Sequence, residues 1–196
     1  MQAPKKHLPI VGILGLIAVA AAGGGVYYYQ FILSHASPAL TPSHRLVIIN
    51  ATVVENSAVA PNGHGFEIKN TAYLNQSTLP SFDVNSGPNM TGVKFTNYQG
   101  NSDNSTINAN PGDTITFYIY AVSASQPPQV AGILGHGFSI SPTPDKVIGG
   151  PIPGVINFGH WYSVTATFTN AGTYLYSCTI FCSNGHPNMH GNIVVG

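Results

Sequence analysis

The chain of 196 residues is long enough for one domain of ordinary size plus an appendage. Apolar residues make up 43% of it, which excludes the disordered class, while charged residues make up only 6% where a soluble domain has about 25%. Six basic and six acidic residues cancel, so there is no basic stripe of the kind that nucleic-acid binding needs. So few titratable groups keep the surface charge nearly constant as the pH falls, which fits either adaptation to an acidic exterior or drift in composition.

An uncharged apolar stretch follows Lys5 and Lys6 and covers residues 8–33. As a helix it would be roughly 39 Å long, more than the bilayer core of about 30 Å. The three tyrosines at 27–29 resemble an interfacial aromatic belt, and the lysines place the N-terminus in the cytoplasm. We therefore expect residues 1–34 to be a retained single-pass anchor in the cell membrane, with the rest of the chain on the outer face. A cleaved signal peptide is the alternative, because the start is basic and the stretch contains a run of small residues.

A Pro/Ser-rich linker occupies residues 35–45, and no long helical period follows it. Short β-rich runs recur instead, each bounded by turn residues, which predicts an all-β sandwich or barrel over residues 46–196. The clearest runs are 46–49, 114–122, 161–168, 173–177 and 192–195.

The segment CTIFCSNGHPNMHG lies between the last two of these runs and contains Cys178, Cys182, His186 and Met189. Thiolates, an imidazole and a thioether are the soft and borderline ligands that favour copper over magnesium, calcium or manganese. The two cysteines are the only ones in the chain, and two in one loop can bridge a pair of metals. The spacing therefore predicts a copper site on a loop that two strands hold in place.

A two-metal site needs a further imidazole from outside the loop. His136 is the best candidate, because it follows the strongest predicted strand and leads directly into Phe138-Ser139-Ile140, which has the pattern of a strand start. His64 has the same flanking residues but no strong strand ahead of it. The other candidates are expected to be in the solvated linker (His35, His44), outward-pointing (His190), or packed or at the surface (His160).

The segments GHGFSI and YLYSCTIFCSNGHPNMHGNIVVG together resemble the CuA domain of haem–copper (cytochrome c) oxidase subunit II, and the same loop spacing occurs in nitrous oxide reductase. The resemblance covers roughly residues 108–196. It implies a Greek-key cupredoxin barrel with one N-terminal transmembrane helix and a centre of two coppers. It also implies that Cys178 and Cys182 bridge both coppers, that His136, His186 and Met189 are terminal ligands, and that Ile180 supplies its backbone carbonyl.

The family also implies a function and partners. The domain would accept electrons from a small external carrier, a cytochrome c or a blue copper protein, and pass them to the haem–copper subunit I. No catalysis of its own is expected, since no Ser/His/Asp arrangement or carboxylate pair stands out, and the oxygen chemistry belongs to the haem partner. The near-zero charge favours an apolar docking face over one steered by salt bridges.

The sequence departs from the family pattern at several places. Ile180 occupies a position that is acidic in many oxidase subunits, so a magnesium contact at the junction with subunit I is in question. No acidic residue immediately precedes His136, and Trp161 is the only tryptophan. A free-standing copper carrier without an oxidase partner therefore remains an alternative function.

Other sites are compatible with parts of the loop. A Cys178–Cys182 disulfide in a metal-free adhesion or binding domain suits an extracellular chain but leaves His186 and Met189 unexplained. Zinc would use the cysteines and histidine but not Met189. A one-copper blue site uses a single cysteine, which the second cysteine argues against.

Overall fold

The computed structural model describes residues 42–53, 63–100, 105–122 and 133–196. Within these ranges the chain is almost entirely β-structure with a single short 3₁₀ helix, η1. The elements in chain order are β1 (His44–Ala51), β2 (Phe66–Leu74), β3 (Phe82–Asp83), β4 (Gly87–Pro88), β5 (Phe95–Gly100), β6 (Thr106–Ala109), β7 (Asp113–Ala121), β8 (Gly135–Ser141), β9 (Lys146–Gly149), β10 (Gly154–Asn157), β11 (Trp161–Phe168), β12 (Gly172–Ser177), η1 (His186–Asn188) and β13 (His190–Val195).

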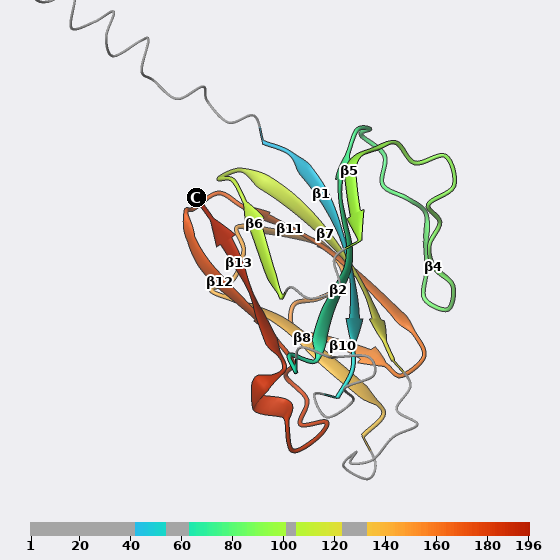
Figure 1. The fold of residues 1–196 in the computed structure, drawn as a ribbon, viewed down its shortest axis with the longest axis vertical. Coiled ribbons are helices and arrows are strands. Elements are labelled where there is room, and N and C mark those ends of the chain that lie inside the picture. Colours follow the sequence, from blue (N-terminus) through green and yellow to red (C-terminus); the bar gives the residue numbers. More distant parts are fainter. Residues whose placement is uncertain (1–41, 54–62, 101–104, 123–132) are drawn as a thin grey trace, which may run out of the picture. The chain divides into compact units, whose positions relative to one another are not determined.

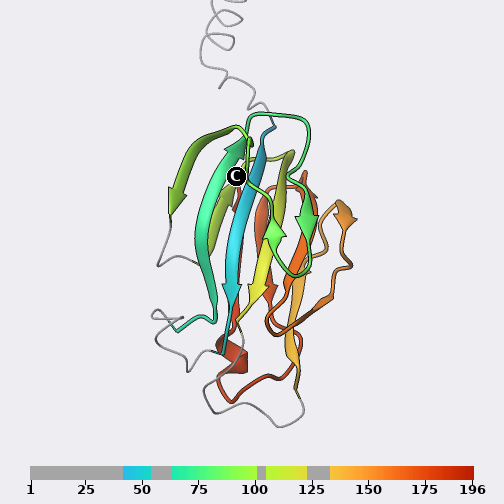
Figure 2. The same ribbon diagram turned by 90° about the vertical axis from the view of Figure 1, so that its right-hand side faces the viewer.

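Two sheets pack face to face (Figures 1 and 2). One has the order β5-β2-β1-β7-β11-β9 and the other the order β10-β8-β12-β13-β6, while β3 and β4 form a small hairpin. Consecutive strands repeatedly change sheet, as from β11 to β12, and two neighbouring pairs, β1 with β7 and β13 with β6, run parallel. Such crossovers are typical of Greek-key sandwiches, and they confirm the all-β prediction.

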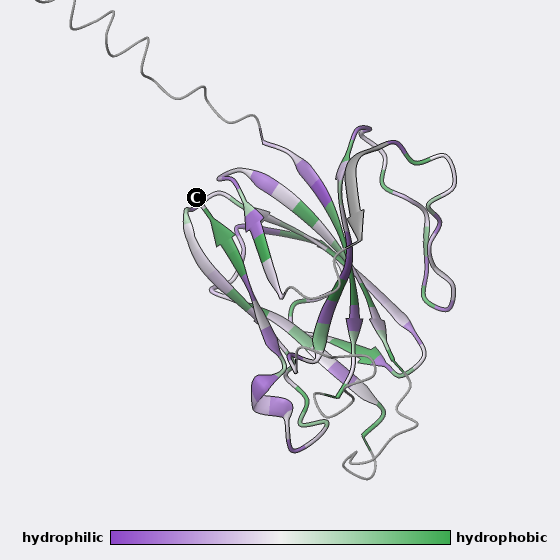
Figure 3. Cartoon of the chain, in the orientation of Figure 1, coloured by the Kyte–Doolittle hydropathy of each residue, from purple (hydrophilic) through white to green (hydrophobic). Residues whose placement is uncertain are grey.

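The core lies between the two sheets and is centred on four aromatic rings from both of them. Phe66 and Phe117 come from the six-stranded sheet, and Phe138 and Tyr176 come from the five-stranded one. Ring centroids are 5.5 Å apart for Phe117 and Phe138 and 5.6 Å apart for Phe66 and Tyr176. Figure 3 shows the alternation of hydrophobic and hydrophilic residues along the strands that lets one face of each sheet be buried.

Asp113, at the start of the central strand β7, is fully buried and connects neighbouring segments at one end of the sandwich. Its Oδ1 accepts hydrogen bonds from Ser43 N at 2.7 Å and Ser43 Oγ at 3.0 Å, and its Oδ2 accepts one from Asn110 N at 2.9 Å. Arg45 Nε lies 3.9 Å from the same Oδ2. A buried carboxylate with this many partners fixes the turn before β7 against the start of β1.

β1 begins at His44, inside the segment expected to be a linker, and His44 is half-buried rather than solvated. Its Nε2 lies 2.7 Å from Thr116 Oγ1 on the adjacent β7. The reason is the parallel pairing of β1 with β7, which extends two residues further than the apolar run Leu46–Ile49 indicates.

The stretch of Pro and Gly residues after β8 also contains more structure than its composition indicates. It supplies β9 to the edge of one sheet and β10 to the edge of the other. The predicted anchor, residues 1–34, lies outside the described residues and stays a prediction. Among the residues that the structure describes, no helix is long and apolar enough to cross a membrane.

The half-buried ring of His44 predicts a pH-dependent loss of stability. Desolvation lowers the pKa of His44, so below about pH 6.5 the unfolded chain binds a proton that the folded chain does not. Stability should therefore fall as the pH drops through the window between the ordinary and the lowered pKa. The free energy of unfolding, measured with denaturant on metal-free protein, should fall less between pH 7.5 and pH 5 in His44→Gln than in wild type. Lys146→Gln, an exposed control, should keep the wild-type pH dependence of the unfolding free energy. The same pH dependence in wild type and H44Q would contradict the role of His44 burial.

Candidate metal centre

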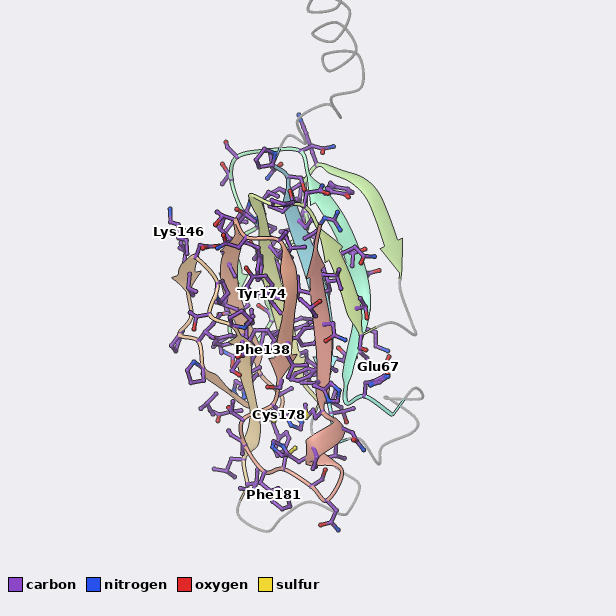
Figure 4. The ribbon with its side chains drawn as sticks, turned by 90° about the vertical axis from the view of Figure 1, so that its left-hand side faces the viewer. Glu67, Phe138, Lys146, Tyr174, Cys178 and Phe181 are labelled. Carbon is purple, nitrogen blue, oxygen red and sulfur yellow. The ribbon has the colours of Figure 1, made fainter. Side chains whose placement is uncertain are left out.

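The loop from Cys178 to Met189 is closed at its base by the strands on either side of it. β12 and β13 pair up to Ser177 and His190, and the Cys178 N–H donates to the Met189 carbonyl at 3.0 Å. The first and last sulfur-bearing residues of the loop are therefore held beside each other at the end of the sandwich. Figure 4 shows Cys178 at this end, between the buried Phe138 and the exposed Phe181.

The helix η1 turns the second half of the loop back toward the cysteines. His186 N donates to the Ser183 carbonyl at 3.1 Å, and Met189 N donates to the His186 carbonyl at 2.9 Å. This turn brings Met189 Sδ to 3.7 Å and His186 Nδ1 to 4.0 Å from Cys182 Sγ. Cys182 is thus the sulfur around which the other side chains of the loop gather.

His136 reaches the loop from β8, which pairs with β12. A ring nitrogen of His136 and the two cysteine sulfurs all lie within 4.8 Å of one another, and all three residues are buried. The His136 ring is fully buried, and neither of its nitrogens has a hydrogen-bond partner within the described part of the chain. The ring of Phe158 packs edge-on against it, with centroids 5.1 Å apart.

Gly137 lets the loop pass directly over β8. A Cβ at this position would lie 2.1 Å from Thr179 Oγ1 and 2.6 Å from Thr179 N, distances that no side chain tolerates. The Gly137 N–H donates to Cys178 Sγ at 3.2 Å, and the carbonyl oxygen of Ile180 lies 3.2 Å from the same sulfur. The glycine after His136 therefore has a role in the site, since it leaves room for the loop and holds one of its sulfurs.

The two cysteines are free thiols and influence each other's ionisation. The contact with Cys182 lowers the pKa of Cys178 to about 4, with further contributions from the nearby His136 ring and the Gly137 N–H. The same contact raises the pKa of Cys182 above its ordinary value. A metal that takes both sulfurs binds them as thiolates, so metal binding would release protons from the pair.

This group of side chains fits copper. A buried imidazole with no hydrogen-bond partner is uncommon, and a metal ion is one way to satisfy such a ring. Two adjacent sulfurs, a thioether and two imidazoles form a soft and borderline donor set. The geometry favours neither the disulfide alternative, since both sulfurs are free, nor a zinc site, which would not use the Met189 thioether in contact with Cys182.

The structure brings all six residues of the predicted ligand set to one place: His136, Cys178, Ile180 through its carbonyl, Cys182, His186 and Met189. Their binding of metal stays a prediction. Sequence reasoning missed Phe158 and the role of Gly137, because both depend on contacts between segments that are far apart in the chain. Two other candidate histidines are not members of the buried group. His160 has its Nδ1 3.0 Å from the Phe158 carbonyl, and His64 lies beside His190. His35 lies outside the described residues.

Comparisons with known proteins found no matching family model and no matching curated protein. Among solved structures, a heme-copper terminal oxidase dimer matches 94% of this chain and 95% of its own at 14% identity and a TM-score of 0.41. Rusticyanin from Thiobacillus ferrooxidans matches 80% and 79% at 18% identity and a TM-score of 0.36. Auracyanin A, a blue copper protein from Chloroflexus aurantiacus, matches 48% and 87% at 25% identity and a TM-score of 0.32. All three TM-scores are below 0.5, so the fold assignment rests on the strand order and not on these similarities.

Proposed function

We propose that the chain is a cupredoxin-type electron-transfer protein with a centre of two coppers. We further propose that it is the anchored subunit of a terminal oxidase that receives electrons from an external carrier and passes them to a haem–copper subunit. The observation that carries the proposal is the buried group of Cys178, Cys182 and His136 with its ligand atoms within 4.8 Å of one another. His186 and Met189 add two donors beside Cys182.

Bound copper would supply the one-electron redox chemistry, and the residues of the chain would keep the site rigid and dry. An electron carrier works fastest when its ligands move little as the charge changes, and the hydrogen bond from Cys178 N to Met189 O closes the loop against such movement. Phe158 covers His136, and Met189 is only 1% exposed, so water has little access to the sulfurs. Exclusion of water in turn tunes the redox potential of a metal site.

The surface around the site suits contact with a redox partner. Leu134 and Phe181 are 75% and 53% exposed, and each lies within two residues of a proposed ligand in the sequence. His186, half-buried with its ring centroid 5.6 Å from that of Phe181, is the proposed ligand side chain with the most access to solvent. An uncharged contact surface with a ligand ring at its edge offers a short route for an electron to and from the metals, with little dependence on ionic strength.

Copper loading of the full-length protein tests this function. Reduced protein should take up two coppers per chain that a chelator wash does not remove, become purple, and show a paramagnetic resonance signal from one unpaired electron shared between two coppers. The absorption should disappear when one electron per chain is added and return when that electron is removed. A stoichiometry of one copper with a single-ion signal would overturn the two-copper assignment, and a covalent bond between the two cysteines in native protein would overturn the site.

A free-standing copper carrier is the second candidate, and the environment of Ile180 favours it. Position 180 is isoleucine, so it offers no carboxylate for a magnesium contact with a partner subunit. Its side chain packs against the hydrophobic core instead. Purification from native membranes in mild detergent separates the two candidates. A haem-containing subunit should copurify with an oxidase subunit, and its absence would favour the carrier.

A further inference from the structure

A second pair of imidazoles lies beside the loop and outside the group described above. The ring centroids of His64 and His190 are 6.2 Å apart, with their planes at 75°. Both residues are partly exposed, so an ion can reach them from solvent. His64 comes from the segment just before β2 and His190 is the first residue of β13, at the same end of the sandwich (Figure 1).

The surroundings of His190 fix which of its nitrogens is free to bind a metal. Nδ1 lies 3.2 Å from the carbonyl oxygen of Pro187. A carbonyl only accepts, so in this contact Nδ1 carries the proton and donates it, which leaves the lone pair of the neutral ring on Nε2. Metal-binding histidines commonly donate their second N–H to a backbone carbonyl in this way, because the bond fixes the tautomer and the ring orientation.

His64 lies in a turn between two glycines that one main-chain hydrogen bond ties to β1. The glycines on either side have φ values of 73° and 70°, in the left-handed region that glycine adopts without strain. Gly63 has open space around it, so its backbone conformation explains why glycine is present there. Thr52 N donates to the Gly65 carbonyl at 2.8 Å and ties this turn to the end of β1. Both rings therefore come from fixed positions of the main chain, which reduces the cost of bringing them to one ion.

The separation of the rings suits a shared ion. With metal–nitrogen bonds of about 2.0–2.1 Å, two imidazoles on one ion have centroids roughly 5–6 Å apart. The observed 6.2 Å requires only a small side-chain adjustment to reach this range. Both residues are partly exposed, so water can fill the other coordination positions and the ion would exchange readily.

We propose that His64 and His190 form a second, exchangeable metal site for a late first-row divalent ion. Cu²⁺ binds tightest to a site of imidazole nitrogen and water, ahead of Ni²⁺ and Zn²⁺. The donor set differs from that of the loop, because it contains no sulfur. The site depends on the two imidazoles alone and not on what the cysteines bind.

Titration of a full-length Cys178→Ser/Cys182→Ser background with Cu²⁺ tests the site, since the sulfurs can no longer compete. We expect one Cu²⁺ per chain, with a resonance spectrum of a single ion bound by two nitrogens. His64→Gln and His190→Gln should each weaken binding at least about 10- to 100-fold, the loss typical even for a supporting partner of a metal ligand. His160→Gln is the matched control, because that ring also lies at hydrogen-bond distance from a backbone carbonyl, and it should leave the affinity unchanged.

An unchanged affinity in H64Q, or a loss only in H190Q, would overturn the shared site. If the serine background does not fold, as judged by circular dichroism, the same variants are titrated with Ni²⁺ in protein whose cysteine site already holds copper. The two proposals can fail separately. Copper uptake at the sulfurs of wild-type protein tests the electron-transfer function, and Cu²⁺ titration of the serine background tests the His64–His190 site.

Discussion

Cys182→Ser should abolish the proposed two-copper centre and leave at most one copper at the loop. Cys182 Sγ is the sulfur next to both Met189 Sδ and His186 Nδ1, at 3.7 and 4.0 Å, and it lies within 4.8 Å of the other two members of the buried group. A serine hydroxyl is a hard, neutral donor that does not replace a thiolate for copper. The purple colour and the shared-electron resonance signal should both be lost.

Cys178→Ser should have the same effect on stoichiometry, since two bridging sulfurs are both required to hold two metals. Asn184→Ala is the matched control, because this residue is exposed in the same loop, and it should keep two coppers. Copper per chain is measured by elemental analysis beside the resonance spectrum. Two coppers retained at the loop of either serine variant, after the exchangeable ion at His64 and His190 has been removed with a chelator, would contradict the bridging role of the sulfurs.

Gly137→Ala should displace the loop from β8 and weaken both metal binding and the fold. The added Cβ would meet Thr179 Oγ1 at 2.1 Å and the backbone nitrogens of Thr179 and Ile180 at 2.6 and 3.0 Å. Backbone atoms cannot move aside as a flexible side chain can, so the loop itself must shift, and the Gly137 N–H loses its contact with Cys178 Sγ. Overpacking of this kind costs about 1–3 kcal/mol, which lowers the melting temperature of a domain of this size by roughly 2–12 °C.

A second substitution tests whether the backbone is the cause. Thr179→Gly in the G137A protein removes the clash with Oγ1 but not the one with the backbone nitrogens, so it should restore only part of the stability and metal affinity. Ser139→Ala, on the same strand and half-exposed, should leave both properties unchanged. A G137A protein with wild-type melting temperature and copper content would contradict the close passage of the loop over β8.

The residues of the candidate centre could be predicted largely because the loop is local in sequence. Donor type and spacing between Cys178 and Met189 carry the information, and the strands on both sides followed from their β-branched and aromatic residues. His136 required a comparison of flanking residues, and β8 brings it to the loop. The strand 161–168 was predicted with the bounds of β11, because a long alternating run lies between two clear turns.

Features that depend on contacts across the sandwich could not be predicted in this way. The pairing of β1 with β7, which buries half of His44, depends on two segments far apart in the chain. The clash that makes Gly137 necessary involves a loop more than 40 positions away, and a glycine in isolation does not indicate its neighbour. The strands β9 and β10 form in a Pro- and Gly-rich stretch because edge positions tolerate such residues, although composition alone predicts a loop.

The closed base of the loop, with its hydrogen bond between Cys178 N and Met189 O, should also slow reaction of the thiols with reagents in solution. With this bond made, Cys178 is 6% and Cys182 0% exposed, so an alkylating reagent must wait for the base of the loop to part. Local openings of this kind can occur without unfolding of the sandwich, and their frequency sets the reaction rate when capture by the reagent is fast. The alkylation rate of metal-free protein should therefore measure how often the base of the loop opens, which is the same motion that a metal would need to reach the two sulfurs.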